Sequence, residues 1–332
     1  MLIVEDTSGA ELQATPEGVA QFRAMGLGLT VHWGLPAVMA LGGWMRYHQR
    51  IPVHEYEKLV EQFNPTRFDA EAWAALVAEI GARAFLITTK HHDGFCMYDT
   101  ALTEYKVTNT PFGRDPIAEL AEACRRRGIQ LYFYYSLLDC HHPGYRTNWP
   151  AYVEYYQGQV RELCTRYGEL GGIVFDGYWP RAEVAPDREH FRPGGAWDLA
   201  GTYDLIHALQ PKAMVANNHH VLPLKGEDYQ VFEQDFPGEN AAGFNTTEVG
   251  DLPLAAWFIV NYRGWYYFQG EQQVKPADQL AEYVLGSAKR KAICWLNVGP
   301  TPDGDILAEE AEALRSTSSL LRRRGASIPT DD

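Results

Sequence analysis

The first residue whose type and position could do chemistry is an aspartate, Asp176. It directly follows the apolar run Ile173–Phe175 and precedes Gly177. A carboxylate there would end a buried strand, and the glycine would let a ligand approach the backbone closely. The alternative is a loop aspartate that only caps the next turn, but the glycine that follows favours a catalytic group.

A second carboxylate, Glu233, ends the apolar segment Tyr229–Phe232. From position alone, Asp228, Asp235 and Glu239 are alternatives to Glu233 for the role of the acid. A purely structural role for Glu233 would be a salt bridge to a neighbouring helix. Two carboxylates that face each other suit hydrolysis of a glycosidic bond, because one attacks or stabilises the anomeric carbon while the other protonates the leaving oxygen. Their pKa values must then differ, so the acid needs a desolvated or like-charged setting.

Adjacent histidines occur three times: His91–His92, His141–His142 and His219–His220. Barrel metallohydrolases use two histidines separated by one residue, so that both rings point to one side of a strand. Adjacent rings on a strand diverge, which favours neutral imidazoles that bind sugar hydroxyls over metal ligands, and structural roles stay open for His141 and His142. Trp44 and Trp265 could pack in the core or offer a flat face to a sugar. We expect no metal and no cofactor.

Eight short apolar runs must position these residues. They span 26–33, 83–89, 129–136, 172–176, 213–217, 229–233, 255–260 and 292–298. Amphipathic segments alternate with them at 69–80, 117–127, 150–167, 197–209, 276–289 and 308–324. This alternation predicts an α/β fold, a parallel (β/α)8 TIM-like barrel that is irregular, with weak or missing helices after strands five to seven. A doubly wound sheet fits less well, since the first strand-to-helix turn has no glycine fingerprint.

Polar residues collect at the carboxyl ends of the predicted strands, where barrel enzymes place their chemistry. In chain order these ends carry His32, His91 with His92, Tyr134 to Ser136, Asp176, Asn217 to His220, Glu233 and Asn297. A fold held together only by burial has no reason to gather polar groups at one end. The sequence therefore predicts a site at this end of the barrel.

Composition excludes several classes of partner. With 29 basic and 43 acidic residues the net charge is −14, which disfavours nucleic acids and anionic membranes. No apolar stretch approaches the ~20 residues of a membrane helix. The start, Met1–Asp6, has no basic or apolar region typical of a signal peptide, and the five cysteines have no metal spacing, so we expect reduced thiols and a cytoplasmic protein.

Several segments spread over nearly the whole chain occur in the order typical of one enzyme family. The most specific is Thr88–Phe95, and others are His32–Leu35, Ile51–Tyr56, Phe63–Pro65, Thr110–Asp115, Phe175–Gly177 and Leu296–Pro300. With them the sequence resembles the α-L-fucosidases of glycoside hydrolase family 29. The resemblance implies a retaining exo-hydrolase that needs no metal and releases terminal α-L-fucose from fucosylated oligosaccharides or glycoconjugates.

The resemblance also implies roles for single residues. Asp176 takes the place of the nucleophile, and the spacing from Asp228 to Glu233 matches the segment that carries the acid/base, with Glu239 as the alternative. The residues expected on the sugar are His32, Trp44, His91, His92, Tyr135 and Trp265, the last of them beside the methyl group.

The chain departs from the family pattern at several positions. Many members have glutamate where this chain has Gly43, and arginine where it has His219. Some members have tryptophan at the position of Val174. The family usually adds a C-terminal β-sandwich, whereas this chain ends soon after its last predicted helix, so we expect residues 1–332 to form a single catalytic barrel domain. The alternatives are another α-L-glycosidase such as an α-L-galactosidase, a metal-dependent hydrolase, or an inactive carbohydrate-binding barrel. The sequence leaves open whether the chain forms a homo-oligomer.

Overall fold

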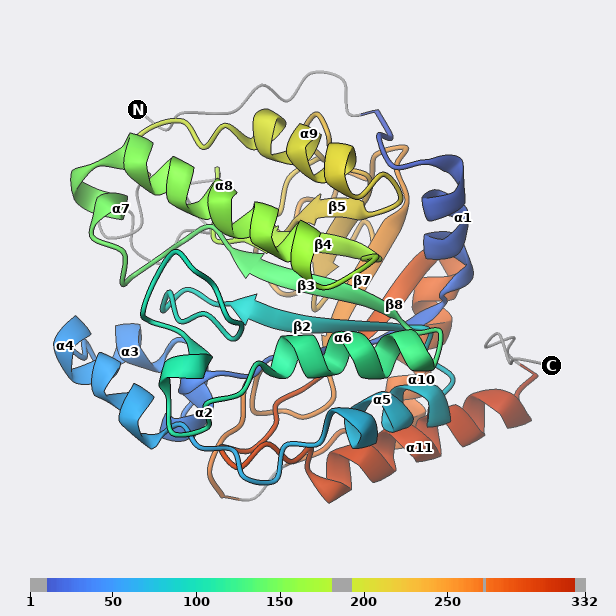
Figure 1. Ribbon diagram of the computed structural model, residues 1–332. Coiled ribbons are helices and arrows are strands. Elements are labelled where there is room, and N and C mark those ends of the chain that lie inside the picture. The colour runs from blue at the N-terminus through green and yellow to red at the C-terminus, as the bar shows by residue number, and fades with distance from the viewer. Residues whose placement is uncertain (1–10, 181–192, 271–272, 326–332) are drawn as a thin grey trace.

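The computed structural model describes residues 11–180, 193–270 and 273–325. Eight parallel strands form one sheet that curls into a nearly closed barrel (Figure 1). The strands are β1 Leu27–Val31, β2 Ala84–Lys90, β3 Gln130–Ser136, β4 Gly172–Asp176, β5 Met214–Asn217, β6 Gln230–Glu233, β7 Leu254–Ile259 and β8 Ala292–Val298. The predicted barrel is confirmed, and each predicted strand is present.

Helices surround the strands, as the alternating sequence pattern predicts. The longer ones are α1 Pro16–Ala24, α5 Ala70–Glu79, α6 Pro116–Arg126, α8 Trp149–Arg166, α9 Leu199–Leu209, α10 Ala277–Lys289 and α11 Ala308–Arg323. Short turns of helix are α2 Leu35–Met39, α3 Met45–His48, α4 Val53–Tyr56, η1 Glu57–Gln62, η2 Val107–Asn109 and α7 Gly144–Thr147. None of the helices in the described ranges is long and apolar enough to cross a bilayer.

The helical layer is incomplete on one side of the barrel. Residues 218–253, all of them described, connect β5, β6 and β7 without a helix, as expected. After β7, however, comes the 13-residue helix α10, so the expectation of a weak or missing helix does not hold there.

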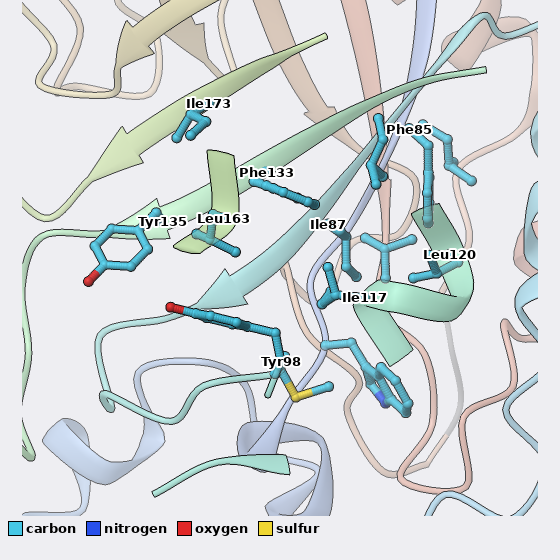
Figure 2. Packing of buried hydrophobic residues seen from close by; sticks show 14 of the residues in the cluster. Phe85, Ile87, Tyr98, Ile117, Leu120, Phe133, Tyr135, Leu163 and Ile173 are labelled. Carbon is cyan, nitrogen blue, oxygen red and sulfur yellow. The ribbon is translucent and has the colours of Figure 1, made fainter. Parts of the chain in front are cut away.

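Side chains of each strand alternate between the barrel interior and the surrounding helices. On β3, Tyr132 and Tyr134 belong to the inner hydrophobic cluster, whereas Phe133 and Tyr135 belong to the outer one. Figure 2 shows the outer cluster, where strand residues pack beside side chains of α6 and α8: Phe85, Ile87, Phe133, Tyr135, Ile173, Ile117, Leu120 and Leu163. This alternation decides which residue at a strand end faces the pocket.

The side chain of one buried aspartate bridges the starts of the two outermost strands of the sheet, β5 and β6, which are not paired with each other. Asp228, just before β6, is fully buried. Its Oδ2 accepts hydrogen bonds from Val215 N of β5 (2.9 Å) and His207 Nε2 (2.8 Å), and its Oδ1 accepts from Gln13 N and Ala14 N (both 2.8 Å). Its backbone nitrogen donates to Val215 O at 2.7 Å. Asp228 therefore closes the barrel.

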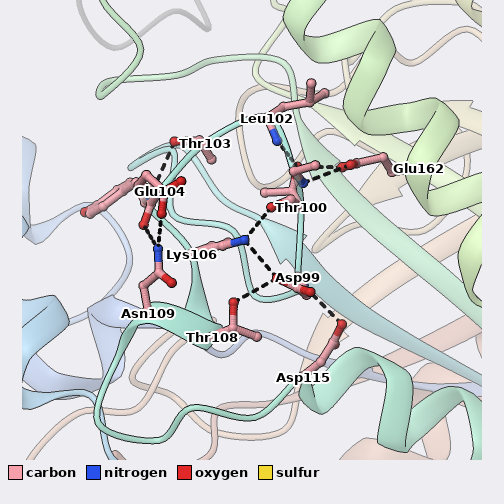
Figure 3. Close-up of polar contacts among 12 residues, drawn as sticks. Asp99, Thr100, Leu102, Thr103, Glu104, Lys106, Thr108, Asn109, Asp115 and Glu162 are labelled. Atoms are coloured by element: carbon pink, nitrogen blue, oxygen red, sulfur yellow. Dashed lines mark hydrogen bonds and ion pairs between the residues drawn. The ribbon is translucent and has the colours of Figure 1, made fainter.

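The connection after β2 is held by polar contacts of its own (Figure 3). Lys106 Nζ donates to Asp99 Oδ1 at 2.8 Å and to Thr100 O at 2.7 Å. Thr100 Oγ1 donates to Glu162 of α8 at 2.5 Å, and Asp99 N donates to Asp115, the N-cap of α6, at 3.0 Å. The segment that begins with the paired histidines is thus fixed to two helices of the outer layer.

Candidate active site

A pocket of about 250 Å³ opens at the carboxyl ends of the strands. Every residue predicted for the site lines it except Tyr135. The complete lining is His32, Trp44, His48, His91, His92, Tyr134, Asp176, Trp179, Asn218, His220, Glu233, Phe244, Trp257 and Trp265.

Asp176, the last residue of β4, is held by two short hydrogen bonds. Tyr134 donates its hydroxyl to Oδ2 at 2.6 Å, and Gly177 N donates to Oδ1 at 2.6 Å. Burial raises the pKa of Asp176 to about 6, against the hydrogen bonds from Tyr134, Gly177 and Asn218, which lower it. Gly177 has φ 84°, and a Cβ there would lie 2.6 Å from Leu138 N, so the turn after the carboxylate requires glycine.

Glu233, the last residue of β6, lies across the pocket from β4 with 17% of its side chain exposed. Asn218 Nδ2 donates to Oε2 at 2.7 Å, and the indole Nε1 of Trp265 donates to Oε1 at 3.1 Å. Burial, and to a smaller extent repulsion from the Asp176 charge, raise the pKa of Glu233 to about 7, although both hydrogen bonds act to lower it. The two carboxylates thus differ in the direction that an acid and a nucleophile require.

His32 presents a hydrogen-bond acceptor to the pocket. Its Nδ1 lies 2.7 Å from Asn297 Oδ1, and Asn297 Nδ2 donates to Trp265 O at 2.8 Å. Since that amide nitrogen faces a carbonyl, Oδ1 is the acceptor and His32 Nδ1 must carry the proton. Burial lowers the pKa of His32 to about 4, so the ring is neutral and its Nε2 is free of a proton near neutral pH.

His92 is held in the same tautomer by a different neighbour. Its Nδ1 lies 2.7 Å from Ser136 Oγ, and Ser136 donates its one hydroxyl proton to Leu138 O. The imidazole must therefore donate from Nδ1, which leaves Nε2 as an acceptor 3.9 Å from Asp176 Oδ2. Burial lowers the pKa of His92 to about 3 and the pKa of His91 well below its usual range.

Tyr135 is the sequence-predicted contact that the structure moves out of the pocket. Its hydroxyl donates to Gln159 Oε1 of α8 at 2.7 Å, and Lys90 Nζ lies 4.6 Å from its ring centroid. The prediction is wrong because neighbouring residues of a strand face opposite sides. Tyr134, one residue earlier, has the interior orientation and contacts Asp176.

The alternative carboxylates lie elsewhere. Glu239 forms an ion pair at the surface with Arg290 at 2.6 Å. Asp235 is buried and accepts hydrogen bonds from the backbone nitrogens of Ala241 and Ala242. Asp228 closes the barrel, as described above. Only Glu233 among the four lines the pocket.

The remaining histidine pairs do not converge on a common point. His141 bonds Glu57 at 2.6 Å and stacks on Tyr105, and His219 is buried against Glu227 at 2.9 Å. His220 lines the pocket, with Nε2 3.8 Å from Glu233 Oε2. Within the described residues, no group of three or more histidine, cysteine or acidic side chains is arranged to hold a metal ion. All five cysteines are free thiols.

The two main departures from the family pattern have structural counterparts. A Cβ at Gly43 would lie 2.8 Å from the ring of Tyr266, so that ring fills the space a side chain at position 43 would need. At the end of β5, His219 is bound to Glu227 and does not line the pocket, whereas Asn218 lines it and donates to Glu233.

Sequence reasoning gave no contact role to part of the pocket wall, although Tyr134, Asn218 and His220 were among the polar strand ends. That part consists of Tyr134, Asn218, Trp179, His220, Phe244, Trp257 and His48. For Tyr134, Asn218 and Trp257 a signal existed, because each has the same parity as inward-facing apolar residues of its strand. Trp179, Phe244 and His48 lie outside the strands, where spacing carries no such information.

Comparisons with known proteins agree with this geometry. The sequence profile of the α-L-fucosidase family matches residues 8–326. The chain is 30% identical to α-L-fucosidase 1 of Arabidopsis thaliana, over 78% of this chain and 52% of the relative. It therefore spans about half the length of the curated plant relatives it matches.

Two solved structures are similar over most of their length. α-L-Fucosidase isoenzyme 1 from Paenibacillus thiaminolyticus superposes with a TM-score of 0.80 at 32% identity, covering 94% of this chain and 77% of that one. A family 29 α-L-fucosidase from Bacteroides thetaiotaomicron, trapped as a covalent intermediate with 2-fluoro-fucosyl fluoride, superposes with a TM-score of 0.81 at 25% identity. The coverage there is 98% of this chain and 79% of that one.

Proposed function

The chain belongs to the α-L-fucosidase family, and from this premise we propose that it hydrolyses terminal α-L-fucosides with retention of configuration. The observation that carries the proposal is the pair of carboxylates in one pocket. Asp176 is held by two hydrogen bonds of 2.6 Å, and Glu233 has the higher pKa. The covalent intermediate trapped in the Bacteroides relative supports the retaining route for this chain.

In the first step, ionised Asp176 attacks the anomeric carbon, and the bond from that carbon to the glycosidic oxygen breaks. Glu233 gives its proton to the departing oxygen, so the aglycone leaves as a neutral alcohol. Between the pKa of Asp176, about 6, and that of Glu233, about 7, the first carboxylate is mostly ionised and the second mostly protonated. This is the combination that the step needs.

In the second step, Glu233, now ionised, takes a proton from water, and the resulting oxygen attacks the anomeric carbon. The bond between sugar and Asp176 breaks, and fucose leaves with its original configuration. Trp265 and Asn218 hold the Glu233 carboxylate from its two oxygens, so the same group is in place for both steps.

Sugar binding rests on neutral hydrogen-bonding groups. His32 and His92 each present Nε2 as an acceptor for a hydroxyl. His91 Nδ1 and Trp257 Nε1, on the pocket wall, are buried with no hydrogen-bond partner in the described part of the chain. No lysine or arginine occurs in the described lining, which suits a neutral sugar over a sulfated or phosphorylated one. We assign the wall beside the methyl group to Trp265.

The experiment is hydrolysis of 4-nitrophenyl α-L-fucoside and α-L-galactoside in parallel, with and without EDTA, with the product anomer read by proton NMR. We expect turnover of the fucoside, α-L-fucose as the first product, and no effect of the chelator. Faster turnover of the galactoside would reassign the substrate. Binding of fucose without turnover of either substrate would show a sugar-binding barrel.

A further inference from the structure

Glu310 is a buried carboxyl group outside the pocket, in the first turn of α11. It is fully buried, and its Oε1 accepts a hydrogen bond from Asn261 Nδ2 at 2.6 Å. Glu309, the residue before it, is exposed and already places an acidic group at the same helix N-terminus. Burying a carboxyl group costs free energy unless the group is hydrogen-bonded, so the helix end alone does not explain the burial of Glu310. The contact with Asn261 is what the buried position provides.

Asn261 lies two residues after the end of β7 and uses both ends of its side-chain amide. Its Nδ2 donates to Glu310, and its Oδ1 accepts from the backbone nitrogens of Arg263 at 2.7 Å and Gly264 at 3.0 Å. An amide turned the other way would face these two donors with its own N–H groups, and the turn would lose both hydrogen bonds. A carboxyl group keeps an acceptor oxygen whether or not it is ionised. Glu310 therefore fixes the orientation of the amide in which the turn is hydrogen-bonded.

The turn that Asn261 holds leads directly into Trp265, a residue of the pocket wall. The indole Nε1 of Trp265 donates to Glu233 Oε1 at 3.1 Å. Tyr262 and Arg263, inside the turn, are exposed, so burial does not hold this part of the connection in place. The two hydrogen bonds to Asn261 Oδ1 therefore contribute to the conformation in which Trp265 reaches Glu233.

We propose that Glu310 is a positioning residue for the acid/base, because through Asn261 it fixes the turn that carries the Trp265 indole to Glu233. This inference rests on the function proposed above. The contacts lead from the helical layer outside the barrel, through the connection after β7, to a carboxylate oxygen in the pocket. The indole favours the ionised form of Glu233, so a loosened turn should raise the pKa of that carboxyl group. Asp176 accepts its hydrogen bonds from other groups and should keep its pKa.

The test is the pH dependence of kcat/KM on 4-nitrophenyl α-L-fucoside for Glu310→Leu, which fills a similar space without an acceptor, with a thermal melt to establish folding. The high-pH limb, which reports Glu233, should move up by about half a unit to one unit, the size expected for the loss of one hydrogen bond. The low-pH limb, which reports Asp176, should stay in place. A loss of stability alone would lower the amount of active enzyme without moving one limb.

Three further variants show what a shift means. Glu310→Gln keeps an acceptor oxygen for Asn261 and should leave the high-pH limb where it is in the unsubstituted enzyme. Glu309→Ala, the matched control, removes the exposed acid of the same helical turn and should leave both limbs in place. Asn261→Ala removes the acceptor of the turn itself, should move the high-pH limb as Glu310→Leu does, and replaces that variant as the test if it does not fold. The proposal is overturned if the high-pH limb stays fixed in whichever of these two variants folds, or if Glu310→Gln or Glu309→Ala moves it as far.

A second readout does not depend on fucosidase activity. In protein labelled with ¹⁵N at tryptophan, the indole N–H signal of Trp265 is the one that disappears in Trp265→Phe. In Glu310→Leu this signal should move upfield and exchange faster with water, because the hydrogen bond to Glu233 is weakened, and in Glu309→Ala it should not change. A moved signal in a protein that does not cleave the fucoside would sink the proposed function and keep the positioning role. An unmoved signal in an active enzyme would sink the positioning role alone.

Discussion

The two carboxylates of the pocket, which we propose as nucleophile and acid/base, stand on walls of the barrel that are built differently. Asp176 ends β4, in a wall where each of β1 to β4 pairs with its neighbour and helices α5, α6 and α8 cover the outside. Glu233 ends β6, after a helix-free connection and beside a strand, β5, to which β6 is not hydrogen-bonded. Asp176, the proposed nucleophile, thus lies in the regular part of the barrel, whereas both carboxylate oxygens of Glu233, the proposed acid/base, are bound by side chains from the irregular part.

This difference explains how each carboxylate is positioned. The backbone places Asp176 through the turn at Gly177, and one of its hydrogen bonds comes from a backbone nitrogen. Glu233 is placed by the side chains of Asn218 and Trp265. A carboxylate placed by the backbone is expected to keep its position when a neighbouring side chain is substituted. The position of a carboxylate held by side chains can be changed by a single substitution.

The largest expected loss of activity comes from a substitution on the regular wall. Asp176→Ala should lower kcat on 4-nitrophenyl α-L-fucoside by at least about 10³-fold, because the attacking group is removed. The measurement is release of 4-nitrophenol, with a thermal melt to establish folding. A folded variant that keeps a tenth of the activity would show that another group attacks the sugar.

The irregular wall should respond in a way that depends on the leaving group. Glu233→Gln should lower the rate on a fucosyl disaccharide by about 10²- to 10⁴-fold, because the departing alkoxide lacks a proton donor. On the nitrophenyl substrate, whose leaving group needs less protonation, the loss should be smaller. Glu239→Gln is the matched control and should be near neutral, since Glu239 lies at the surface. Equal losses on both substrates would argue against the acid role.

The stability of the irregular wall should depend strongly on one residue, Asp228. Asp228→Ala removes the acceptor of four hydrogen bonds at a fully buried position and leaves His207 without its carboxylate, so we expect a loss of about 3–5 kcal/mol in the free energy of unfolding. Asp69→Ala on the regular wall, which removes the N-cap of α5, should cost about 1 kcal/mol. Urea unfolding of both variants compares the walls directly, and similar losses would show that Asp228 does not close the barrel.

The smallest expected effect needs no substitution, because it comes from changing the protonation of the two carboxylates with pH. Since Asp176 must be ionised and Glu233 protonated, kcat/KM should rise as pH passes about 6 and fall as pH passes about 7. A stopped assay across this range with the unsubstituted enzyme measures both limbs. A profile that is flat from pH 5 to 8 would show that kcat/KM does not depend on the ionisation of these two groups.

The sequence was most informative about the regular wall. Apolar runs and following helices predicted all eight strands, and the aspartate after Phe175 follows from the end of such a run. The resemblance placed Tyr135 on the sugar, but Tyr135 lies outside the pocket. Aromatic residues occupy both sides of β3, so residue type does not show which side faces inward, and only pairing with the neighbouring strands fixes it.

The irregular wall was harder to predict for a physical reason. Asn218 contacts Glu233 from fifteen residues away, and Trp265 contacts it from thirty-two, through connections with no periodic pattern. Asp228 was weighed as an acid because an aspartate before a strand shows its charge but not its burial. Single-domain organisation and a cytoplasmic location stay predictions.

The closure at Asp228 also bears on how the protein behaves at high concentration. A sheet whose end strands are not paired with each other retains two edges, and such edges are sites where another chain can add a strand. Here the segment at Gln13 and Ala14 is bound to the same carboxylate that bridges the edges. The residues leading into α1 therefore lie at one end of the boundary between the two edges, where they leave less of either edge open to another chain.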